Sequence, residues 1–183
     1  MKYWLATMLI ILASTASQAL NTQEQRWVEA VRNTYGDRAG KRVETWRREM
    51  EQFQGLSERQ KLTEVNAFFN QLNFVNDDRL WGKKDYWATP LEFLGSNAGD
   101  CEDFTIAKYF SLLELGVSDK KLRLVYVKAI TLNQFHMVLA YYSKPSAEPI
   151  LLDNIDPEIK KASKRRDFCL LYTSPSPRDT ALS

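Results

Sequence analysis

The order of the apolar patterns along this chain constrains its fold more than any other feature. Three segments with apolar residues at helical spacing come first, at residues 23–35, 40–53 and 57–72. A fourth helix is predicted from about Cys101 to Leu115, because Gly116 is a favourable residue just beyond a helix C-terminus. Strand-like segments follow at residues 122–130, 135–142 and 149–153. This order predicts an α+β domain, in which N-terminal helices and a central fourth helix pack on an antiparallel β-sheet.

The size and charge of the chain narrow its class. Its 183 residues are enough for one domain with a proper core, and 44% hydrophobic with 26% charged residues is ordinary for a globular protein. The formal net charge of +2 gives no reason to expect nucleic acid or a strongly acidic partner. Function must therefore be sought in local motifs.

Residues 1–19 have the pattern of a secretory signal peptide. Lys2 supplies a positive start, residues 5–13 form a short apolar run, and Ser17-Gln18-Ala19 is a small-x-small cleavage signal. Cleavage is expected after Ala19, which would leave the mature protein outside the cytoplasm. An uncleaved inner-membrane anchor is the alternative, although the apolar run is short for a membrane span.

The chain has two cysteines, Cys101 and Cys169. Exported proteins often join cysteines as disulfides, and such a pair would exclude a catalytic thiol. If the two do not pair, Cys101 is a lone thiol at the start of the predicted fourth helix. Both arrangements stay open at this point.

Cys101, His136 and Asp153 could form a catalytic triad. A helix N-terminus favours a thiolate through its partial positive charge, and its free N–H groups can hold an oxyanion. His136, the one histidine of the chain, lies near the start of a predicted strand, and Asp153 ends the next. Adjacent antiparallel strands can bring these two side by side, so that the carboxylate orients the imidazole. Taken singly, a structural cysteine, a core histidine and a turn aspartate are the alternatives.

Four blocks of sequence then point to a family. They read WATPLE (87–92) with GDCEDF (99–104) and AKY (107–109), LRLVYVK (122–128), HMVLAYY (136–142), and LLDN (151–154). Together they closely resemble the bacterial transglutaminase-like cysteine peptidases, the LapG type of periplasmic protease. The resemblance runs from about Trp27 to Asp167.

This resemblance implies a papain/transglutaminase-like fold and maps the family's Cys-His-Asp triad onto Cys101, His136 and Asp153. It also implies a periplasmic endopeptidase that cleaves a large cell-surface adhesin near its N-terminus, at a di-alanine site, and so releases cells from a biofilm. The implied regulator is the periplasmic domain of an inner-membrane cyclic-di-GMP receptor, which holds such enzymes inactive.

Calcium is the implied cofactor, with Asp100, Glu102 and Asp103 as its ligands. Calcium binds several oxygen atoms, which three carboxylates within four residues can supply. These carboxylates would raise the pKa of a neighbouring thiol, and a bound cation would offset that effect. The alternative is that the acidic residues merely favour the positive N-terminus of the helix.

The chain is therefore divided into a signal peptide (1–19), a peptidase domain (20–167) and a suspect tail (168–183). The tail resembles translated adaptor or out-of-frame sequence, and Cys169 would then be accidental. A final strand would be missing and one sheet edge left open. Two other functions stay open: a transglutaminase-like acyltransferase that uses an amine acceptor, and a non-catalytic binding module of the same fold.

Overall fold

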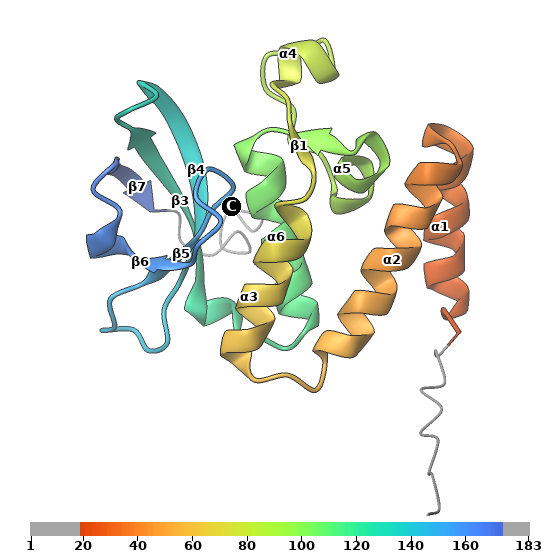
Figure 1. The fold of residues 1–183 in the computed structure, drawn as a ribbon, viewed down its shortest axis with the longest axis horizontal. Helices are drawn as coiled ribbons and strands as arrows, with labels where there is room; N and C mark the ends of the chain where they lie inside the picture. Colours follow the sequence, from red (N-terminus) through yellow and green to blue (C-terminus); the bar gives the residue numbers. More distant parts are fainter. Residues whose placement is uncertain (1–18, 174–183) are drawn as a thin grey trace, which may run out of the picture.

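The computed structural model describes residues 19–173, so the predictions for residues 1–18 and 174–183 lie outside the described residues. Figure 1 shows a sheet on one side, a group of helices on the other, and helix α6 between them. This arrangement agrees with the α+β class predicted from the order of the apolar patterns. Within the described residues, no helix combines the length and the apolar character that a membrane span requires.

Three N-terminal helices form the outer layer, namely α1 (Thr22–Tyr35), α2 (Asp37–Phe53) and α3 (Glu58–Phe69). The second begins earlier than the predicted residue 40, because Gly36 adopts a φ of 91° and turns the chain directly from α1 into α2. The third starts at a capping box formed by Ser57 and Gln60, which satisfies two backbone N–H groups at its end.

The segment between α3 and α6 contains several short elements. They are β1 (Asn73–Phe74), α4 (Asp77–Leu80), α5 (Pro90–Ser96) and β2 (Ala98–Gly99). Strands β1 and β2 pair in parallel, which brings the chain after α3 beside the residues that precede α6. The sequence pattern indicated only turns here, because none of these elements is long enough to show a period.

The sheet has five antiparallel strands in the order β6-β5-β4-β3-β7. Strands β3 (Leu122–Ala129), β4 (Gln134–Tyr141) and β5 (Ile150–Leu152) match the three predicted segments closely. Strand β6 (Lys160–Lys161) and the 3-10 helices η1 (Asp119–Lys121) and η2 (Ala162–Lys164) were not expected.

The expectation of a missing final strand is wrong for the residues that follow Asp167. Phe168–Thr173 form β7, which pairs with β3 across a register shift between Tyr126 and Val127. This strand pairs with the outer edge of β3, so the sheet is not left open there. The origin of residues 168–183 stays a prediction.

Helix α6 (Cys101–Glu114) is the centre of the core. One face packs on β4, where the Thr105 hydroxyl donates a hydrogen bond to the carbonyl of Met137 at 3.1 Å. The other face packs on α3 and α5, and the rings of Phe93 and Phe104 meet edge to face with centroids 4.7 Å apart. Because both faces of α6 are covered, the position of its first residue is tightly determined.

A buried arginine on α2 ties three helices together. The Arg47 Nε donates to Glu24 of α1 at 2.8 Å, and its Nη1 donates to Glu114 at the end of α6 at 2.9 Å. The guanidinium also lies over the Trp46 ring, 4.8 Å from its centroid. Removing one partner of a buried ion pair leaves the others with uncompensated charge.

We therefore expect Arg47→Met to lower the free energy of unfolding by about 3 kcal/mol, measured by urea denaturation followed by circular dichroism. The control is Arg48→Met, because Arg48 is exposed and pairs only with Glu44 on its own helix. That change should stay within about 0.5 kcal/mol of the native chain. Equal effects of the two substitutions would contradict this role of Arg47.

Candidate active site

The start of α6 presents Cys101 from a closely packed turn. Asp100 is the N-cap, and its side chain accepts a hydrogen bond from the N–H of Glu102 at 3.2 Å. Asp103 completes the capping box by accepting from the N–H of Asp100 at 3.3 Å. A Cβ on Gly99 would lie 2.5 Å from the Asp103 carboxylate, so this turn requires glycine. Cys101 is thereby held at the first helical position, with 8% of its surface exposed.

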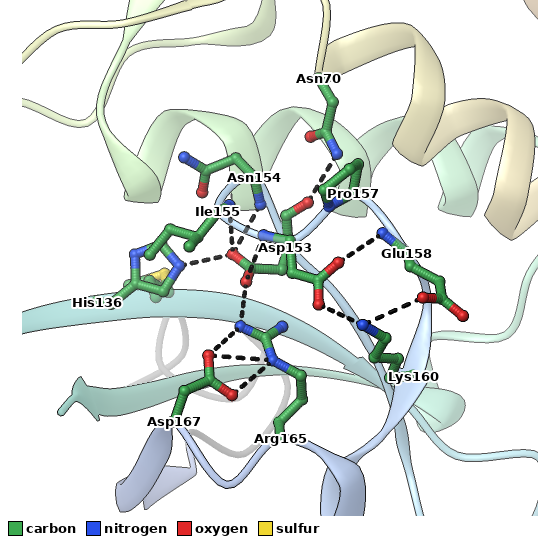
Figure 2. Close-up of polar contacts among 12 residues, drawn as sticks. Asn70, His136, Asp153, Asn154, Ile155, Pro157, Glu158, Lys160, Arg165 and Asp167 are labelled. Atoms are coloured by element: carbon green, nitrogen blue, oxygen red, sulfur yellow. Dashed lines mark hydrogen bonds and ion pairs between the residues drawn. The ribbon is translucent and has the colours of Figure 1, made fainter. Parts of the chain in front are cut away.

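His136 and Asp153 meet at the other side of the site (Figure 2). His136 lies on β4 and Asp153 directly follows β5, its neighbour in the sheet. The His136 Nε2 and the Asp153 Oδ1 are 2.7 Å apart, and both side chains are buried. Because an ionised carboxylate only accepts hydrogen bonds, Nε2 carries the proton of the neutral ring and Nδ1 is left as the basic nitrogen.

The Asp153 carboxylate sits in a cradle of donors. Its Oδ1 also accepts from the N–H groups of Asn154 and Ile155, at 2.7 and 3.1 Å. Its Oδ2 lies 2.8 Å from the Nη2 of Arg165. Burial alone would raise the pKa of Asp153, but the hydrogen bond from His136 and these further donors hold it well below its usual range. Asp153 is thus ionised although it is buried.

The Cys101 sulfur lies against β4 at Met137, the residue after His136. The backbone N–H of Met137 hydrogen-bonds to the sulfur and lowers the pKa of the thiol. Burial and the neighbouring Glu102 carboxylate act more strongly in the opposite direction, so the pKa of Cys101 is raised far above its ordinary value. The structure therefore brings the three predicted triad residues to facing elements, while their catalytic roles stay a prediction.

Glu102 contacts Cys101 directly. Its Oε2 accepts the thiol proton of Cys101 at 2.9 Å, and its Oε1 accepts from the hydroxyl of Tyr126 on β3 at 3.2 Å. Tyr126 was not among the predicted site residues, because a tyrosine in a strand indicates no more than sheet packing. In this arrangement Glu102 holds the thiol protonated.

An acidic cluster lies next to Glu102 at the start of α6. Ligand oxygens of Asp77, Asp100 and Asp103 all lie within 4.8 Å of one another. Two of the three predicted metal ligands, Asp100 and Asp103, belong to it, whereas the third member is Asp77 of α4 rather than Glu102. Asp77 was not predicted as a ligand, because two adjacent aspartates in an irregular segment are typical of a turn. Only the pairing of β1 with β2 brings it to the start of α6.

The donor set fits a hard cation. The Asp77 Oδ2 accepts the N–H of Tyr86, but its Oδ1 is buried with no hydrogen-bond partner among the described residues. A buried carboxylate oxygen without a partner is costly unless a positive charge satisfies it. Carboxylate oxygens are also the ligands that calcium and magnesium prefer. The cluster can therefore hold such a cation with three carboxylates.

A buried lysine is linked to Asp153 through Asn70. Lys108 is 1% exposed and its Nζ donates to the Asn70 Oδ1 at 2.7 Å, while the Asn70 Nδ2 donates to the Asp153 carbonyl at 2.7 Å. Burial lowers the pKa of Lys108 to about 7, and the Asp153 charge partly opposes this. Neither residue was predicted, because a lysine within a helix usually indicates a solvent-exposed face.

The two cysteines are free thiols in this structure, with Cys101 buried and Cys169 exposed on β7. The disulfide that would have excluded a catalytic role is therefore not formed. Cys101 stands as the lone buried thiol of the described residues.

The chain matches known proteins in sequence and in structure. The sequence model described as bacterial transglutaminase-like cysteine proteinase BTLCP matches residues 19–173. Legionella pneumophila LapG is similar at a TM-score of 0.73 and 38% identity, over 82% of this chain and 83% of that chain. A calcium-bound LapG of that organism gives 0.73 and 37%, over 82% and 83%. An EGTA-treated LapG gives 0.73 and 38%, over 82% and 81%. No curated protein sequence matches significantly.

The acidic cluster makes the metal-free protein sensitive to pH. Burial, with repulsion from Glu102, raises the pKa of Asp100 to about 8, and burial raises the pKa of Asp103 to about 6. Both values exceed the ~3.9 of an unfolded aspartate, so the folded state favours the protonated carboxyls. Their stabilising contribution is complete below about pH 4 and is lost as the pH rises through about 6 and then about 8.

We therefore expect the melting temperature of EGTA-treated protein to fall from about pH 5 to about pH 9, measured in thermal scans. Asp100→Asn removes one of the two ionisations and should flatten this fall. Asp78→Asn, an exposed neighbour of Asp77 in the same short helix, should leave it unchanged. A melting temperature that rises with pH in chelator would contradict the electrostatics of the cluster.

Proposed function

This chain belongs to the bacterial transglutaminase-like cysteine proteinase family, and from that membership we propose that it is a calcium-dependent endopeptidase whose nucleophile is Cys101. The observation that carries the proposal is the pairing of His136 with Asp153 at 2.7 Å, on the strand that also contacts the Cys101 sulfur. A buried imidazole oriented by an ionised carboxylate beside a thiol is the arrangement that nucleophilic catalysis by cysteine requires.

In the proposed reaction, the Nδ1 of His136 takes the thiol proton, and the Cys101 sulfur attacks the carbonyl carbon of the scissile peptide bond. The backbone N–H of Cys101 is the donor proposed to hold the oxyanion of the tetrahedral intermediate, because the Asp100 side chain already accepts the N–H groups of Glu102 and Asp103. The C–N bond then breaks, His136 gives its proton to the leaving amine, and a thioester remains. Water, deprotonated by His136, hydrolyses the thioester and regenerates the thiol. Asp153 keeps the imidazole in one tautomer throughout.

The proposed cofactor is calcium, held by Asp77, Asp100 and Asp103. The support is the unpartnered Asp77 oxygen, together with a similar protein whose solved structure is described as calcium-bound. When bound, the cation supplies positive charge that offsets the carboxylates around Cys101 and so favours ionisation of the thiol. Glu102 favours the protonated thiol of Cys101, and the charge of the cation would offset this effect.

The proposed substrate is a large surface adhesin, cleaved near its N-terminus at a di-alanine site to release cells from a biofilm. The proposed location is the periplasm, reached through the predicted signal peptide of residues 1–19. The proposed regulator is the periplasmic domain of an inner-membrane cyclic-di-GMP receptor. These three parts of the proposal rest on the resemblance of the four sequence blocks to LapG-type enzymes.

Replacing the nucleophile tests the enzymatic part. Cys101→Ala should reduce cleavage of an adhesin fragment that contains the di-alanine site by at least about a thousandfold, because no other group can form the thioester. The matched control is Cys169→Ser, which removes the exposed thiol of β7 and should cleave at the native rate. Cleavage is followed on denaturing gels; activity retained by Cys101→Ala would disprove the proposed nucleophile.

Calcium dependence is tested at the residue that the sequence pattern missed. Asp77→Asn should weaken calcium binding, measured by calorimetry, by at least the roughly 10- to 100-fold that loss of an outer ligand partner costs. Asp78→Asn makes the same chemical change one residue away on an exposed side chain and should bind like the native chain. Equal affinities for Asp77→Asn and the native chain would remove Asp77 from the site.

A further inference from the structure

Asp153 has a second charged partner besides His136, and this partner comes from the far end of the domain. Arg165 lies between η2 and β7 and is buried, with its Nη2 2.8 Å from the Asp153 Oδ2. The same Nη2 lies 2.7 Å from the Asp167 Oδ2, and Nε donates to the Asp167 Oδ1 at 3.0 Å (Figure 2). Asp153, Arg165 and Asp167 therefore form a row of charges of alternating sign, which begins at the carboxylate that contacts the imidazole.

The two oxygens of Asp153 are divided between its partners. Oδ1 faces His136 at 2.7 Å, and Oδ2 faces Arg165 at 2.8 Å. A carboxylate with one oxygen held by a guanidinium cannot rotate without breaking a charge-assisted hydrogen bond. Arg165 thus adds the one charged contact to a carboxylate that backbone N–H groups also hold, those of Asn154 and Ile155 on Oδ1 and that of Asp156 on Oδ2, among the contacts of the described residues.

Phe168 packs against both Arg165 and His136. The Arg165 guanidinium carbon lies 3.9 Å from the Phe168 ring centroid, and the His136 and Phe168 ring centroids are 5.6 Å apart. One aromatic side chain therefore packs against both partners of Asp153.

The burial of Arg165 exceeds what an ion pair with Asp167 would need. Asp167 is partly exposed, with 34% of its side chain accessible, so the two could pair at the surface. Instead Arg165 is placed inside, where its Nη1 has no hydrogen-bond partner among the described residues. An unsatisfied buried donor costs free energy, so the inward position is not explained by the Asp167 pair alone.

We propose that Arg165 is a positioning residue of the active site: it holds the Oδ2 of Asp153 so that Oδ1 stays on His136, and Asp167 moderates the charge that it brings. This inference rests on the proposed function, in which His136 is the base and Asp153 orients it. Arg165 acts through Asp153 and touches neither the substrate nor the nucleophile.

Other charged groups also lie near Asp153 and Arg165. On α6, Lys108 interacts electrostatically with Asp153. After β5, Asp156 pairs with Lys160 at 2.7 Å and interacts with Arg165. Asp167 accepts hydrogen bonds from the Nε of Arg165 and from the same Nη2 that faces Asp153. Substitutions at Arg165 and Asp167 leave the other groups in place and change the charge on the pair in opposite directions.

The test uses the single histidine of the chain as a reporter. In full-length protein with ¹⁵N-labelled imidazole, the ring signals of His136 identify its tautomer and the pH midpoint at which the Asp153–His136 pair takes up its proton. Arg165→Met removes a cation from the pair, so the midpoint should rise by about one pH unit. Asp167→Asn leaves Arg165 less neutralised, so the midpoint should fall. Arg165→Lys keeps the charge and should lie between Arg165→Met and the native chain.

The matched control is Arg166→Met, which deletes the same charge from the adjacent, exposed residue and should leave the midpoint unchanged. Shifts of opposite sign for Arg165→Met and Asp167→Asn support the inference, because a merely structural disturbance would not reverse its sign. Shifts of the same sign, or none, overturn it. If Arg165→Met fails to fold, the same criterion is applied to Arg165→Lys, whose midpoint should rise by less, and to Asp167→Asn, whose midpoint should fall.

Parallel cleavage assays separate this inference from the proposed function. Normal cleavage by the native chain with no opposite shifts means that Arg165 has no positioning role, while the peptidase proposal stands. Opposite shifts with no cleavage, under calcium and on the adhesin fragment, mean that the charge relation exists but the proposed function fails, and Arg165 then positions no catalytic pair.

Discussion

The buried carboxylate of Asp103 is the interaction on which the site depends. It accepts the N–H of Ala88 at 2.7 Å and the N–H of Asp100 at 3.3 Å, and none of its surface is exposed. These bonds join the loop before α5 to the N-cap of α6 and determine where the helix begins. The same carboxylate belongs to the acidic cluster with Asp77. One side chain therefore positions the nucleophile and contributes to the charge that opposes its ionisation, which couples the placement of Cys101 to any cation bound there.

The site is divided into two electrostatic halves that meet at the thiol. On the α6 side, Glu102 and the cluster surround Cys101 with negative charge, so the thiol is held protonated unless a cation intervenes. On the sheet side, positive and negative groups alternate, and Asp153 stays ionised despite its burial. The charge around Cys101 is thus set mainly by residues at the start of α6, and the orientation of His136 by residues of the sheet side.

Apolar patterns were sufficient for strands β3, β4 and β5, whereas α6 was predicted from the Gly116 that follows it. The sequence could also nominate Cys101, His136 and Asp153, because cysteine and histidine are scarce in the chain and the predicted elements are adjacent. It could not find Asp77, which depends on a two-residue strand pair, or Arg165, which lies in a basic run typical of a solvated surface. Which charged side chains meet depends on tertiary contacts, and these contacts leave no periodic pattern in the local sequence. Strand β7 was missed because its neighbours in sequence are rich in serine and proline.

Arg165 and Phe168 follow all the other residues of the site along the chain. A polypeptide that emerges with its N-terminus first can form the helices, and so present Cys101, while the last strand is still absent. In that interval the thiol is in place, but the carboxylate that orients the imidazole lacks its guanidinium and its aromatic support. The orientation of the imidazole is therefore completed only when the last strand pairs with β3, and an incompletely synthesised chain lacks it.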